Sequence, residues 1–268
     1  MNNERDFLAI YAFDTNELYH HGILGQKWGV RRYQNPDGSL TDAGKKRYSN
    51  LGSLLIEKKN DFHSNVDKWG SGPDKNLLII TGLSGSGKST LAVSIKDQIP
   101  NTDVIHLDVY YDNPIKDKVF RSKGFDDYLK KKVPEYEKIA KNFTKYDEVR
   151  FDANKNQKLN KEYWDTMDKV RDAIFDYSRE SYRTNRVIAE GVQWLDTSMY
   201  PNITEKEKVV KNMPMIIKGT SLGKSTIRAA IRDGMSILDG KRFIDYMKAR
   251  VEWQKVWNKQ VSELKALA

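Results

Sequence analysis

The feature that most constrains the fold of this chain is a glycine-rich octapeptide that separates an apolar run from a helical pattern. The octapeptide, residues 82–89, reads GLSGSGKS, and the run before it, residues 76–81, reads NLLIIT. A short apolar run that ends in glycine is typical of a strand buried in a parallel sheet. From Lys88 to about Gln98 the apolar spacing is typical of a helix. The order strand, loop, helix predicts the start of a parallel α/β unit.

The rest of the chain continues this alternation. Further strands are predicted at residues 103–108, 186–190 and 214–218, and helices at 113–183, 223–236 and 241–266. Pro114 and Pro134 are expected to break the first of these helical regions. Alternation of this kind predicts an α/β fold with a parallel sheet covered by helices on both faces, which makes three layers. The long helical insertion, residues 112–185, matches no motif.

The octapeptide also agrees with the pattern G-x-x-x-x-G-K-[ST] at every fixed position. In that pattern the glycines let backbone N–H groups approach phosphate oxygens, the lysine reaches the outer phosphates and the final hydroxyl binds Mg²⁺. The start of the following helix adds partial positive charge. The sequence therefore predicts a P-loop NTPase fold that binds ATP and Mg²⁺. The expected nucleotide-binding residues are Gly82, Ser84, Gly85, Ser86, Gly87, Lys88, Ser89 and Thr90.

Four segments within residues 76–240 together resemble the uridine kinase branch of the P-loop kinases, with a weaker likeness to zeta-toxin kinases. After the octapeptide they read HLDVYY at 106–111, VIAEGV at 187–192 and KSTIRAAIRDG at 224–234. The resemblance implies transfer of a phosphoryl group from ATP to a hydroxyl of a small acceptor. That acceptor would be a nucleoside, a nucleotide or a nucleotide sugar.

In such kinases the second segment serves the acceptor. The resemblance implies that Asp108 is the base for the acceptor hydroxyl and that Tyr110 and Tyr111 line the acceptor pocket. The carboxyl ends of parallel strands meet beside the phosphate loop, so a carboxylate there can take up a proton. In the alternative interpretation, Asp108 caps the next helix and the two tyrosines pack in the core.

The third and fourth segments imply charge control around the phosphates. Glu190 would hold Mg²⁺ through water, although it could instead be an acid in solvent at a strand end. Arg228 and Arg232 are four residues apart, so they share one helix face. With Lys88, they would neutralise charge on the outer phosphates as part of a lid. The alternative is an amphipathic helix with exposed arginines.

The start of the chain suggests a separate module. Residues 71–74 read SGPD, a turn or linker, so we expect an N-terminal module at 1–72 and the kinase domain at 73–268. The stretch from Tyr19 to Tyr48 resembles a segment of tailed-phage proteins of Gram-positive hosts. That resemblance implies a phage protein and docking to a phage or host partner.

Composition narrows the remaining choices. The absence of cysteine excludes disulfides, thiolate catalysis and cysteine-ligated zinc. With no signal peptide and no apolar run of membrane-spanning length, we expect no membrane partner and a location in the bacterial host cytoplasm or in the virion. Nearly all of the formal charge of +9 lies after Gly72. This charge suits a phosphorylated ligand or a nucleic acid, so polynucleotide-end phosphorylation and a phage docking protein with a nucleotide switch remain alternatives.

Overall fold

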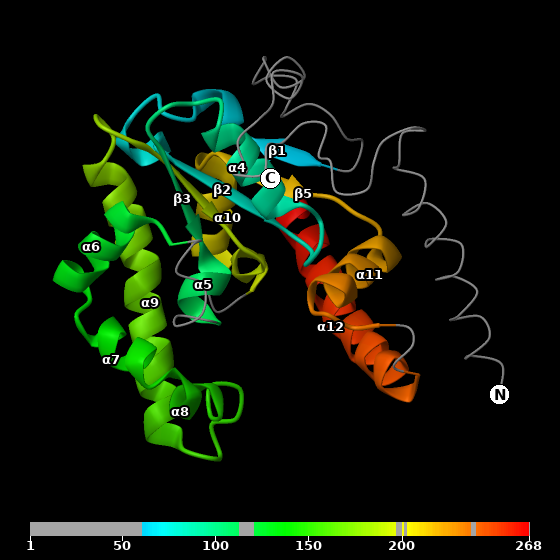
Figure 1. Ribbon diagram of the computed structural model, residues 1–268. Coiled ribbons are helices and arrows are strands. Elements are labelled where there is room, and N and C mark those ends of the chain that lie inside the picture. Colours follow the sequence, from blue (N-terminus) through cyan, green and yellow to red (C-terminus); the bar gives the residue numbers. More distant parts are fainter. Residues whose placement is uncertain (1–60, 113–120, 197–199, 201–202, 237–239, 268) are drawn as a thin grey trace, which may run out of the picture.

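The computed structural model describes residues 61–112, 121–196, 200, 203–236 and 240–267, and these form an α/β fold (Figure 1). Its centre is a five-stranded sheet in the order β1-β5-β2-β4-β3. Four strands are parallel, and β1 joins the edge antiparallel to β5. The predicted α/β class with a parallel sheet is confirmed. The strands are β1 Phe62–Ser64, β2 Leu77–Gly82, β3 Thr102–His106, β4 Arg186–Glu190 and β5 Met215–Lys218.

The four parallel strands are the four that the apolar runs predicted, each within about two residues. β1 was not predicted, because its three residues carry no apolar run. Phe62 pairs with Ile217 of β5. The sheet therefore includes a segment that lies before the expected boundary at residue 72, and that boundary itself stays a prediction.

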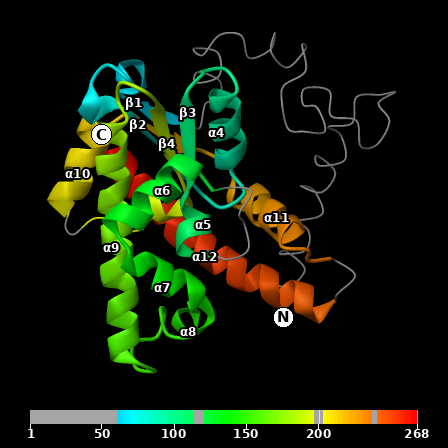
Figure 2. The same cartoon turned by 60° about the vertical axis from the view of Figure 1, so that its left-hand side comes forward.

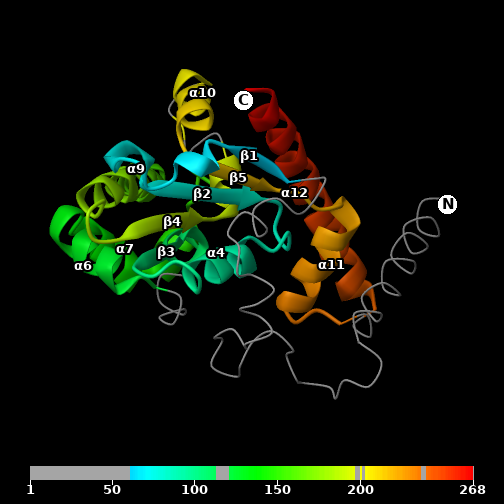
Figure 3. The same cartoon turned by 90° about the horizontal axis from the view of Figure 1, so that it is seen from above.

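Two hydrophobic layers cover the sheet, because successive strand residues face opposite sides. On one side Leu78 and Ile80 of β2 pack with Leu91 and Ile95 of α4 (Lys88–Lys96). The other face packs against α9 (Gln157–Glu180), α10 (Ile203–Asn212) and α12 (Lys241–Ala266). Figures 2 and 3 show α4 on one side of the strands and α10 on the other.

From residue 121 onward the insertion is mostly helical, as predicted. Three short helices, α6 (Lys123–Lys132), α7 (Glu135–Lys141) and α8 (Phe143–Asp147), pack along α9 (Figure 1). Ser122 caps α6 by accepting a hydrogen bond from the Phe125 N–H, and Pro134 separates α6 from α7. Pro114 and residues 19–48 lie outside the described residues.

Two helices close the opposite side of the molecule. α11 (Leu222–Arg232) packs on α12 through Ile227, Ala230 and Met247. Asp233, just after α11, accepts a hydrogen bond from Arg250 of α12 at 2.9 Å. Of the helices in the described ranges, none combines the length and the apolar character needed to cross a membrane.

Candidate functional site

The glycine loop, residues 82–89, connects β2 to α4 at the carboxyl end of the sheet. Gly85 and Gly87 have φ angles of 82° and 91°, a region that favours glycine. A Cβ atom on Gly85 would lie 2.6 Å from the Ser225 carbonyl oxygen, whereas one on Gly87 would meet nothing within 4 Å. Gly85 therefore lets α11 approach the loop, and Gly87 faces open space.

Lys88 is the first residue of α4, and its side chain is buried behind the loop. Its Nζ donates a hydrogen bond to the Leu83 carbonyl oxygen at 3.2 Å. Burial lowers the pKa of Lys88, and the charge of Arg232 adds to this, while Glu190 and Asp108 act in the opposite sense. Among the described residues the ammonium group forms no ion pair within 4 Å, so it can still donate hydrogen bonds to an anion in the loop.

Glu190 ends β4 between Ile80 of β2 and His106, the last residue of β3, and it is only 3% exposed. Its Oε1 accepts a hydrogen bond from Ser89 Oγ at 2.9 Å and lies 2.6 Å from His106 Nδ1. Burial alone would raise the pKa of Glu190, but the His106 hydrogen bond and the Lys88 charge outweigh burial and lower it. The structure thus brings the two expected magnesium ligands together and keeps the carboxyl group ionised.

Asp108 lies just after the neighbouring strand β3, in the first turn of α5 (Leu107–Tyr111), and it is exposed. Its Oδ1 accepts a hydrogen bond from Gln193 Nε2 at 2.7 Å. The same nitrogen donates to Asp112 Oδ2 at 2.9 Å, and Asp112 forms an ion pair with Arg150. Asp108 is therefore held by a side chain of another element through one of its two oxygens.

Tyr110 and Tyr111 are buried, with exposed fractions of 1% and 4%. The Tyr110 hydroxyl donates to Asp126 and the Tyr111 hydroxyl donates to the Met167 carbonyl oxygen, each at 2.9 Å. The Tyr110 ring makes an edge contact with Phe125 at 5.2 Å between centroids. The packing interpretation describes these surroundings better than a place on a pocket wall does.

The two arginines of α11 lie beside the glycine loop. Arg232 Nη1 is 3.4 Å from Ser84 Oγ, and its Nε donates to Asp233 at 2.8 Å. Arg228 is exposed, and its Cβ would touch a Cβ on Gly85 at 3.2 Å. From α12, Gln254 donates to the Ser84 carbonyl oxygen at 2.8 Å. Both helices therefore fix the loop, and both arginines come within reach of it.

No family model, characterised protein or solved structure matches this chain. The roles of the site residues therefore depend on their distances, burial and charge.

Several of these residues were not predicted. The positions of His106 and Gln193 could have indicated them, since both lie near the carboxyl ends of predicted strands, where a site is expected. Asp112 is four residues after Asp108, which places both on one helix face. Gln254 and Arg150 have no local signal, because long-range packing brings them to the site.

Of the remaining loop residues, Ser86 is buried and Thr90 is exposed on α4. The Ser86 N–H donates to the Leu83 carbonyl oxygen at 3.1 Å, which closes the turn of the loop. In the described part of the chain, Ser86 Oγ has no hydrogen-bond partner. Such a buried hydroxyl is expected to bond to a ligand or to water.

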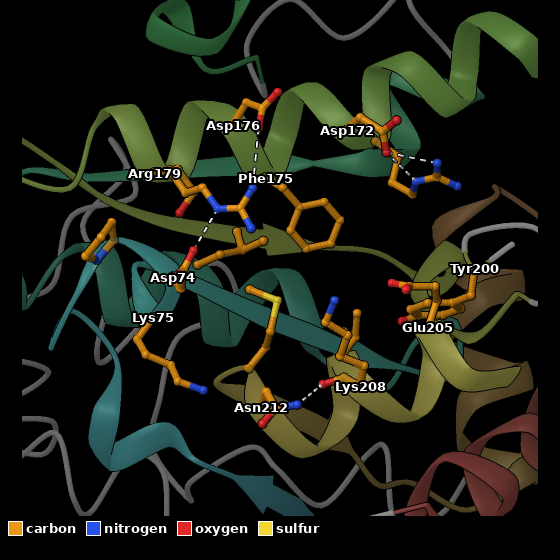
Figure 4. Close-up of a pocket in the computed structure, with 16 residues that line it drawn as sticks. Asp74, Lys75, Asp172, Phe175, Asp176, Arg179, Tyr200, Glu205, Lys208 and Asn212 are labelled. Atoms are coloured by element: carbon orange, nitrogen blue, oxygen red, sulfur yellow. Dashed lines mark hydrogen bonds and ion pairs between the residues drawn. The ribbon is translucent and has the colours of Figure 1, made fainter. Parts of the chain in front are cut away.

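A separate cavity lies between α9, α10 and the turn at Pro73–Lys75 (Figure 4). Its volume is about 620 Å³. Leu77, the first residue of β2, lines this cavity, whereas the glycine loop begins at Gly82, the last residue of β2. Figure 4 shows Asp74 pointing toward Arg179, with which it pairs at 2.8 Å. No residue of the glycine loop lines this cavity, so it is separate from the candidate site.

Proposed function

We propose that this protein is an ATP-dependent phosphotransferase of the P-loop kinase type, which phosphorylates a hydroxyl of a small acceptor. The observation that carries the proposal is the 2.9 Å hydrogen bond between Ser89 Oγ and the buried Glu190 carboxylate, directly beside Lys88 and the glycine loop. The exposed carboxylate of Asp108 lies just after the end of the adjacent strand, β3. In this proposal a metal-binding acid, a phosphate-binding cation and an exposed carboxylate share one edge of the sheet.

The loop suits the phosphates of ATP. Gly85 and Gly87 in left-handed conformations favour a path on which successive backbone N–H groups converge on an anion. Open space next to Gly87 leaves room for that anion. The buried Lys88 ammonium and the start of α4 supply the matching charge.

The hard oxygens of Ser89 and Glu190 suit Mg²⁺. Kinases hold this ion with one or two protein oxygens, water and the phosphates. When bound, Mg-ATP would supply the phosphoryl group and a partly neutralised leaving group. His106 would orient Glu190 from the other side through its 2.6 Å contact.

The remaining residues act on the acceptor and on developing charge. Asp108 accepts the proton of the acceptor hydroxyl and directs its oxygen toward the phosphate. Arg232, near Ser84, and Arg228 stabilise the charge that develops on the transferred group. The acceptor is expected to resemble a nucleoside, a nucleotide or a nucleotide sugar.

A panel of acceptors with γ-labelled ATP tests the proposal. The purified full chain would be incubated with Mg²⁺ and with nucleosides, nucleotides, nucleotide sugars and 5′-hydroxyl oligonucleotides. We expect label to move to a small acceptor. Label on oligonucleotides alone would favour the polynucleotide-end kinase, and tight ATP binding with no labelled product from any acceptor would favour a nucleotide switch.

A further inference from the structure

Gln193 occupies a position that the phosphotransferase proposal does not use. It belongs to the short 3-10 helix Val192–Leu195, which follows β4. One nitrogen, Nε2, donates to both Asp108 Oδ1 at 2.7 Å and Asp112 Oδ2 at 2.9 Å. A side-chain amide has two N–H groups, so each carboxylate can receive its own hydrogen bond.

The local backbone leaves room for this arrangement. A Cβ on Gly191 would lie 2.4 Å from Gln193 Oε1 and 2.8 Å from Leu107 Cβ. The φ angle of Gly191 is 167°, an extended value, so glycine is needed there for space and not for backbone strain. Gln193 Oε1 is buried and has no hydrogen-bond partner among the described residues. The Gln193 amide therefore directs its nitrogen to two carboxylates while its oxygen has no partner among the described residues, which indicates a role for the nitrogen.

The groups around the two carboxylates show why a donor is needed. Asp108 and Asp112 lie on α5 and at its end, and like charges at this spacing repel. Arg150, which follows α8, pairs with Asp112 but also with Asp147 at 2.7 Å. Tyr163 of α9 donates to the Tyr111 carbonyl oxygen at 2.6 Å and does not reach Asp108 through any described bond. Gln193 is thus the one described side chain that bonds both carboxylates.

We propose that Gln193 is a positioning residue that holds Asp108 ready for the acceptor hydroxyl by bonding it to Asp112. This inference rests on the proposed function for its catalytic part. Its structural part, the shared amide, stands independently. Without the amide, Asp108 would turn away from Asp112 and lose its fixed direction.

The test compares Gln193→Leu, which keeps the shape and removes the donor, with the matched control Gln98→Leu. Gln98 donates only to the Ser94 carbonyl oxygen within α4, at 2.8 Å. The first readout is the carboxyl ¹³C titration of Asp112 in the full chain. Burial and the negative charge of Asp108 raise the pKa of Asp112. The ion pair with Arg150 and the hydrogen bond from Gln193 act in the opposite direction and lower the pKa. Gln193→Leu should therefore raise the pKa of Asp112 further, while Gln98→Leu should leave it in place.

The second readout is Mg-ATP turnover with water as the acceptor. Gln193→Leu should lower kcat about tenfold or more, in the range of a misplaced base, and leave KM for ATP within about twofold. Adding Asp112→Asn should restore part of kcat, because the new amide can donate to Asp108 and one negative charge is gone. Gly191→Ala should reproduce the loss by displacing Gln193.

The outcomes separate the two proposals. An Asp112 titration unchanged by Gln193→Leu would overturn the shared amide, whatever the activity. A shifted titration with unchanged kcat would overturn the positioning role. Failure of the unsubstituted protein to bind Mg-ATP, or to transfer label from it to water or to any acceptor of the panel, would instead overturn the phosphotransferase proposal.

Discussion

At the residue scale, the site contains two carboxylates in opposite environments. Glu190 is 3% exposed and receives hydrogen bonds from Ser89 and His106. Asp108 is exposed, and its Oδ1 accepts a hydrogen bond from the neutral amide of Gln193. Acids whose surroundings differ in this way can take different chemical roles within one site. This contrast agrees with the proposed roles, in which Glu190 holds Mg²⁺ and Asp108 acts on the acceptor hydroxyl.

Asp108→Asn should therefore lower kcat by a factor of about 10²–10⁴, because the amide keeps the shape but cannot accept a proton. The dissociation constant for Mg-ATP should stay within about twofold, since Asp108 lies on the acceptor side. Steady-state kinetics and calorimetry measure the two effects. Asp127→Asn on α6, where the side chain is 57% exposed, is the control and should change neither. Near-normal turnover in Asp108→Asn would remove this residue from the mechanism.

Much of the site was predictable at this scale because its parts follow strand ends. Lys88, Ser89, Glu190 and Asp108 all follow or end short apolar runs, and parallel strands bring such ends together. Gln193 was missed, because its role depends on the missing Cβ of Gly191 and on where α5 begins. The order of residues does not show such a close fit in space.

At the scale of elements, the glycine loop packs closely against α11 at Gly85. Gly85→Ala and Gly87→Ala both place a side chain at positive φ, at a cost of about 1–2 kcal/mol each. Only Gly85→Ala also presses on the Ser225 carbonyl oxygen. We expect it to lower the free energy of unfolding by about 1–3 kcal/mol more than Gly87→Ala does. Urea unfolding measures both, and equal losses would contradict the close packing of α11 on the loop.

The elements themselves were largely predictable. The strands of the parallel sheet and the long helices α9 and α12 carry strong apolar patterns over their own lengths. β1 carries none, and its place at the sheet edge comes from pairing with β5. The turn from β3 directly into α5 was also missed, because residues 103–108 continue as an apolar run past His106.

At the scale of the whole molecule, residues 61–72 contribute to the central fold. Asp61 pairs at 2.6 Å with Lys218, the last residue of β5, which lies opposite Gly82 in the sheet. Trp69 is 5% exposed, packs with the α4 side of the core and donates to the Asn76 carbonyl oxygen at 2.9 Å. These contacts tie the segment before the expected boundary to the sheet.

A chain that begins at residue 73 should therefore be less stable than one that begins at residue 61. Loss of the buried Trp69 side chain alone is worth about 3–5 kcal/mol. The bared edge of β5 should also promote association. Thermal unfolding and light scattering compare the two chains. Equal stability would show that the fold begins after residue 72, as the sequence alone predicts.

The central claim is that the glycine loop and Lys88 hold the phosphates of ATP. Titration calorimetry of the full chain with Mg-ATP tests it most directly, using Lys88→Met and the control Lys96→Met, which alters an exposed lysine on the same helix. Methionine keeps most of the apolar stem, and the ammonium group it removes is buried, so Lys88→Met should remain folded by circular dichroism. We expect the wild type and Lys96→Met to bind Mg-ATP alike, and Lys88→Met to bind at least tenfold more weakly, a loss of about 1.4 kcal/mol or more. Equal binding by all three proteins, or no heat of binding in the wild type, would contradict the account.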